Sequence, residues 1–177
     1  MNRLCLLLAT AAMMLSSFAF AASPYRSEQS RGIKALSDEE IADYSNGKGM
    51  GFAKAAELNG YPGPTHVLEL ADELALSPQQ KVKTEQLFEH MQTRAQTLGL
   101  RLVHEERTLD ELFASKTVSR ESLTKALSAI ATIQNQIRET HLRAHLDEAE
   151  ILSEEQVKRY WHLRGYADVS PTRQHKH

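Results

Sequence analysis

Leu76-Ser77-Pro78-Gln79-Gln80 returns later in the chain as Leu152-Ser153-Glu154-Glu155-Gln156. In each copy a serine stands three residues before a glutamine, which is the spacing of a helix capping box. Pro78 suits the first helical position because that position needs no backbone N–H. The repeat therefore predicts two helix starts about 70 residues apart, with room for a long helical hairpin between them.

Apolar spacing predicts helices over about 65–75, 78–114, 120–151 and 154–164, the last ended by Gly165. Two sets of apolar residues fall on one face of the two long helices: Phe88, Met91, Ala95, Leu98, Leu102, Leu109 and Leu112, then Leu123, Leu127, Ile130, Ile133 and Ile137. No strand pattern accompanies them, so the predicted fold class is all-α. Two long helices cannot cover both their apolar faces alone, and we therefore expect a homodimer.

The N-terminus has the features of a secretory signal peptide. Arg3 precedes an apolar run over 4–20, and Ala19-Phe20-Ala21 is a small-residue cleavage site. An uncleaved membrane anchor is the alternative, because the run is nearly long enough to span a bilayer. Cys5 is the single cysteine, so cleavage after residue 21 leaves a chain without disulfides or thiolate metal ligands.

The remaining chain divides into three predicted parts. Residues 22–64 form a flexible arm rich in glycine and proline, with one short helix opened by the capping-box pattern Ser37-Asp38-Glu39-Glu40. Gly47-Lys48-Gly49-Met50-Gly51 lacks the Gly-Lys-Ser/Thr of a phosphate loop. Residues 65–166 form the helical domain, and 167–177 form a disordered polar tail.

Composition argues against two functional classes. The 177-residue chain has 21 Lys and Arg against 23 Asp and Glu, so it lacks the basic excess of a nucleic-acid-binding protein. It contains no nucleophile elbow and no dinucleotide-binding loop. We therefore expect neither nucleic-acid binding nor enzymatic activity.

His141 and His145 are the strongest candidate site. Residues four apart lie on one face of a helix, which lets two imidazoles reach one metal ion. In a hairpin that turns near residue 117, facing positions sum to roughly 234, so Glu89 or His90 is expected opposite His145. His66 is expected from the preceding helix, at the same end of the hairpin.

Such a set of imidazoles and a carboxylate suits Zn(II), Ni(II), Co(II) or Cu(II), and suits Cu(I) less well. The alternative interpretation is that His141 and His145 are polar residues on a helix flank.

With its signal peptide, its two L-S-x-x-Q motifs and its thiol-free helices, the chain resembles the periplasmic LTxxQ-motif family. That family includes the Spy/CpxP chaperones and heavy-metal resistance sensors such as CnrX and ZraP. The resemblance covers about residues 65–166, with serine in place of threonine in both motifs. It implies a hooked four-helix antiparallel hairpin that dimerises.

The resemblance also implies two possible roles. In the sensor branch, histidines and a carboxylate on the helices bind metal, and a membrane-bound regulator receives the signal. His141 and His145 match the spacing of one ligand pair there, although the sensors usually carry methionine at the later position. In the chaperone branch, the dimer holds unfolding envelope proteins without ATP. We expect a periplasmic, non-catalytic metal-binding stress or resistance sensor, with the chaperone as the alternative.

Overall fold

The computed structural model describes residues 23–166 of the chain. These residues divide into two compact units, 23–30 and 31–166. In the first unit the described residues contain one short 3-10 helix, η1, at Arg26–Glu28. The predicted signal peptide at 1–21 and the predicted tail at 167–177 lie outside the described residues.

The second unit is built from helices. These are α1 (Asp38–Ser45), α2 (Lys54–Glu57), α3 (Pro64–Glu69), α4 (Pro78–Ala114), α5 (Arg120–Ile151) and α6 (Glu154–Leu163). Residues 23–166 contain no β-strand, only an isolated bridge between Ile33 and Leu36. The all-α prediction is confirmed. None of the helices in residues 23–166 combines the length and apolar character needed to span a membrane.

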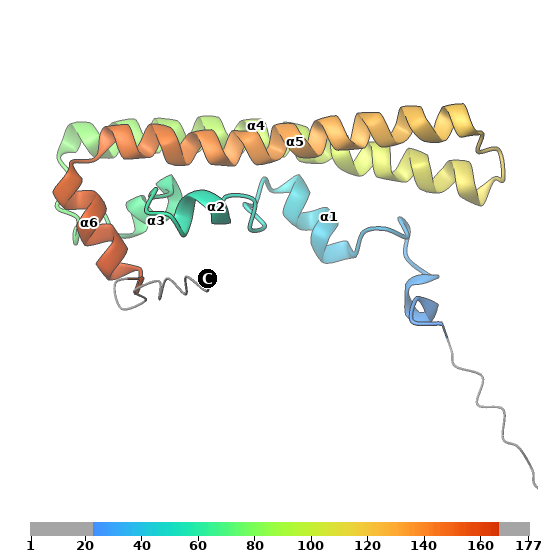
Figure 1. The fold of residues 1–177 in the computed structure, drawn as a ribbon, viewed down its shortest axis with the longest axis horizontal. Helices are drawn as coiled ribbons and strands as arrows, with labels where there is room; N and C mark the ends of the chain where they lie inside the picture. The colour runs from blue at the N-terminus through green and yellow to red at the C-terminus, as the bar shows by residue number, and fades with distance from the viewer. Residues whose placement is uncertain (1–22, 167–177) are drawn as a thin grey trace, which may run out of the picture. The chain divides into compact units, whose positions relative to one another are not determined.

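The two long helices, α4 and α5, lie side by side and are joined by a five-residue turn (Figure 1). Their starts are fixed by local hydrogen bonds, because Ser77 and Ser119 each form a complete capping box. The buried core between them consists of Leu98, Leu102, Ile130, Ile133 and Ile137.

Two sequence expectations differ from the structure. Leu127 is 49% exposed, and its neighbour Ala126 is buried instead. The buried spacing on α5 therefore runs through 126, 130, 133 and 137, and residue 127 points about 100° away from it. The helix expected over 65–75 ends at Glu69, and the chain then makes turns up to Ala75, which has a left-handed φ of 51°.

The two copies of the L-S-x-x-Q motif meet in space. Both glutamines complete their own capping boxes, and they also hydrogen-bond to each other. The Nε2 of Gln80 donates to the Oε1 of Gln156 at 2.7 Å, and the reverse bond measures 3.1 Å. Each amide also donates to a main-chain carbonyl, that of Ile151 for Gln80 and that of Leu74 for Gln156. The repeat thus joins the start of α4 to the start of α6.

Residues 31–64, expected to be a flexible arm, contain α1 and α2 and pack along α4 and α5 (Figure 1). The capping box predicted at Ser37 is present. Gly99 on α4 permits a close approach of α1, because a Cβ there would lie only 1.9 Å from the carbonyl oxygen of Tyr44. Ile33 and Leu36 are buried against Val103 of α4.

Candidate metal centre

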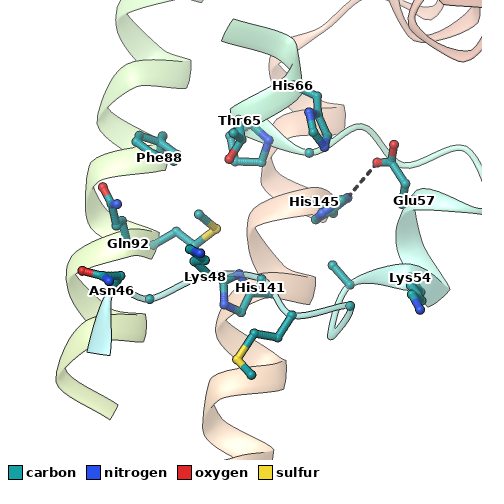
Figure 2. A pocket seen from close by; sticks show the side chains of 18 residues that line it. Asn46, Lys48, Lys54, Glu57, Thr65, His66, Phe88, Gln92, His141 and His145 are labelled. Atoms are coloured by element: carbon teal, nitrogen blue, oxygen red, sulfur yellow. Dashed lines mark ion pairs between the residues drawn. The ribbon is translucent and has the colours of Figure 1, made fainter. Parts of the chain in front are cut away.

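His141 and His145 lie one turn apart on α5 and are both buried, with exposed fractions of 4% and 9%. They line one cavity of about 560 Å³, whose other walls come from α2, α3, α4 and the loop 46–51 (Figure 2). The i, i+4 spacing thus places both imidazoles on the same side of the helix, as predicted. Both rings are withdrawn from solvent.

The imidazole of His145 is held in one orientation. Its Nδ1 lies 2.8 Å from the carbonyl oxygen of Tyr61. A carbonyl only accepts hydrogen bonds, so Nδ1 carries the proton and donates, and in the neutral ring Nε2 keeps a free lone pair. Gly63 lets the chain pass against the ring, because a Cβ there would lie 2.8 Å from the Cε1 and Nε2 atoms of His145. A histidine that donates one N–H to a carbonyl while its other nitrogen is free is oriented as metal-ligating histidines are.

The surroundings of His141 disfavour the charged imidazole, and one of its nitrogens lacks a hydrogen-bond partner. Burial lowers the pKa of His141, and the nearby His145 lowers that pKa further. The ring stacks on Phe52, with 6.3 Å between centroids and 9° between planes. Its Nε2 is buried and makes no hydrogen bond. Buried polar atoms almost always have partners, so this nitrogen is available to a ligand.

Glu57 of α2 lies beside His145 and was not identified from the sequence. Its Oε2 is 3.9 Å from the Nδ1 of His145, the contact drawn dashed in Figure 2. The carboxylate also accepts hydrogen bonds from the hydroxyls of Tyr160 and Tyr166 and from the Nε of Arg164, at 2.9 to 3.2 Å. Burial, followed by the charge of Glu57, raises the pKa of Tyr160. Glu57 therefore holds α6 against α2 and is already occupied by donors.

The other three predicted ligands are placed differently. His66 of α3 lines the same cavity as His141 and His145, and its Nδ1 lies 2.8 Å from the Oε2 of Glu69. Glu89 and His90 are exposed on α4, and neither belongs to the lining of that cavity.

His90 instead lines a second cavity, of about 450 Å³, whose walls come from α4 and α5 alone. Within residues 23–166 the structure contains no cluster of three or more His, Cys, Asp or Glu side chains placed to hold a metal ion. The structure thus gathers three of the five predicted residues around one cavity, without closing them into a ligand set.

No protein-family model matches the chain, and neither a curated protein nor a solved structure does. The resemblance to the LTxxQ-motif family stays a prediction from the motifs.

Proposed function

We propose that this chain is a periplasmic, non-catalytic metal-binding protein of the stress or heavy-metal-resistance sensor type. The observation that carries the proposal is the state of two buried imidazoles one turn apart. His145 donates its Nδ1 proton to a carbonyl, and His141 has a buried, unpartnered Nε2. Metal ions bind an imidazole nitrogen through its lone pair, and the Nδ1 bond of His145 leaves Nε2 as the nitrogen available to a metal.

His66 is the third ligand in this proposal. It lines the same cavity, and its Nδ1 contact with Glu69 is the carboxylate–histidine arrangement that leaves Nε2 for a metal. Its side chain is 37% exposed and belongs to a helix of six residues, so it has room to move toward the buried pair. Zn(II), Ni(II), Co(II) and Cu(II) all accept imidazole nitrogen.

The test is calorimetric titration of the chain lacking residues 1–21 with Zn(II) and Ni(II). The H141A/H145A double variant should lose at least about 100-fold in affinity, and H66A should lose about tenfold or more. The E89A/H90A double variant is the matched control, since these residues lie outside the cavity. Unchanged affinity in H141A/H145A would refute the site, whereas a loss in E89A/H90A would restore these two residues as ligands.

The finer architecture and the cellular location are part of the same proposal. A hooked four-helix antiparallel hairpin that dimerises would cover large apolar side chains that are exposed on the long helices: Val82, Leu100, Phe113, Leu127 and Leu146. Light scattering of the chain lacking residues 1–21 should give the mass of a dimer, and a monomeric mass would contradict it. Fractionation of cells and N-terminal sequencing would test export and cleavage after residue 21.

The second candidate function is an ATP-independent chaperone that binds unfolding envelope proteins. The same exposed apolar side chains favour it, because they offer a surface for unfolded clients. A denatured client should aggregate less in the presence of the protein, and L100S/L127S should weaken this effect. Aggregation unaffected by a stoichiometric amount of the protein would rule this role out.

A further inference from the structure

The cavity that contains the two histidines also contains sulfur. Met50 and Met91 are the two methionines of residues 23–166, and both belong to its lining. Met91 is 8% exposed on α4, across the cavity from α5, and Met50 lies in the loop between α1 and α2. Imidazole and thioether groups therefore reach the cavity from three separate elements.

The backbone at Met50 is in an uncommon conformation. Its φ is 43°, in the left-handed region that side chains other than glycine rarely adopt. The loop is held by main-chain hydrogen bonds, from the N–H of Lys48 to the oxygen of Asp43 and from the N–H of Phe52 to the oxygen of Gly49. Gly51, the next residue, also has a positive φ. At Met50 a glycine would adopt the same backbone conformation with less strain. Unfavourable backbone conformations of this kind concentrate at functional sites.

The charges around the cavity disfavour hard divalent ions. Glu57 is the one acidic residue in the lining, and three donors from the C-terminal segment already bind its carboxylate. Lys48 and Lys54 line the same cavity. Lys48 forms an ion pair with Asp43, so the positive potential in the lining comes chiefly from Lys54. A monovalent cation experiences half the repulsion that a divalent cation experiences from the same charges. Thioether sulfur is a ligand that soft Cu(I) prefers, and imidazole is a ligand that copper also accepts.

We propose that this cavity selects a soft monovalent cation, Cu(I) or Ag(I), through the sulfur atoms of Met50 and Met91 together with the imidazoles of His141 and His145. The inference rests on the proposed function, since it assumes that the two histidines bind metal. The preferred ion in this proposal differs from the sequence prediction, in which the thiol-free chain favoured divalent ions. The methionines set the selectivity, and the histidines contribute to the binding of every metal.

The test is an anaerobic competition titration of Cu(I) against a chromophoric Cu(I) chelator, with Zn(II) calorimetry run in parallel. M50L/M91L should bind Cu(I) roughly tenfold or more weakly and should bind Zn(II) with unchanged affinity. H141A/H145A should weaken the binding of both ions. T65A, another residue of the lining, is the control and should alter neither affinity. Circular dichroism checks that each variant is folded.

X-ray absorption at the copper edge of the unmodified protein loaded with Cu(I) gives a second readout that needs no variant. Sulfur should be among the atoms that surround the copper. A shell of nitrogen and oxygen alone, or unchanged Cu(I) affinity in M50L/M91L, would overturn the selectivity proposal and leave the histidine site standing. If H141A/H145A alters neither Cu(I) nor Zn(II) binding, the proposed function itself fails.

Discussion

Replacing Glu148 by glutamine should change how the stability of the fold depends on pH. Glu148 is fully buried on α5, and its Oε1 accepts a hydrogen bond of 2.9 Å from the hydroxyl of Thr84 on α4. Its Oε2 is buried without a partner. Burial raises the pKa of Glu148 from 4.5 to about 7, although the bond from Thr84 acts in the opposite direction.

The sign of the pH effect follows from where the proton binds more tightly. The folded protein holds the Glu148 proton up to a higher pH than the unfolded chain, so the stability of the fold falls as the pH rises from about 4.5 to about 7. At about 1.4 kcal/mol for each pH unit, the full loss amounts to roughly 3 kcal/mol. Above pH 7 this loss persists. Glutamine keeps the oxygen that accepts from Thr84 and cannot ionise.

The assay is urea unfolding between pH 5 and pH 8, followed by the fluorescence of Trp161, the single tryptophan. The free energy of unfolding of E148Q, minus that of the unmodified protein, should rise by roughly 2–3 kcal/mol over this range. Burying the glutamine amide costs the same free energy at every pH, so this cost does not contribute to the change with pH. E150Q, at an exposed position of the same helix, should show no such rise. A difference for E148Q that stays constant with pH, or that falls, would refute the reasoning.

Two further changes test the packing of the fold. Replacing Gln80 or Gln156 by alanine should cost about 1–3 kcal/mol each, but the double variant should lose less than the sum, since either single change already removes both hydrogen bonds between the two amides; strictly additive losses in urea unfolding would show that the two act independently. Gly99→Ala should destabilise the protein, although alanine normally favours a helix by about 1 kcal/mol, because its Cβ would meet the carbonyl oxygen of Tyr44. Hydrogen exchange in α1 should therefore accelerate in this variant and not in Gly32→Ala, where the added Cβ has open space; equal protection in both variants would contradict the close contact.

The starts of the helices that begin with a capping box could be predicted because local hydrogen bonds set them. The helix predicted over 78–114 is found at Pro78–Ala114, and the capping box of Ser77 that defines its start involves residues three apart. The helix predicted over 65–75 was too long because tertiary packing decides its end. Leu74 leaves the helix and is buried in a cluster with Val67, Leu152 and Tyr160. A periodic pattern does not reveal that competition.

The candidate site was predicted in part, for a geometric reason. The rule that facing residue numbers sum to roughly 234 gives the position along the two antiparallel helices. Thr84 bonds to Glu148, close to the pairing that this rule predicts. The rule says nothing about rotation around the helix axes, so it placed His90 opposite His145 while the structure places His90 in another cavity. Glu57 could not be foreseen, because its partners are contributed by packing between segments about 100 residues apart in the chain.

The paired amides of Gln80 and Gln156 restrict which substitutions the two positions can accept during evolution. Each amide supplies a donor and an acceptor to the other, and each also binds a carbonyl in another turn of the chain. A mutation at one position removes both hydrogen bonds between the amides, whereas a second mutation at the other position has no bond between the amides left to remove. We therefore expect the two glutamine positions to covary among related chains, and a chain that retains a single L-S-x-x-Q copy to be rare.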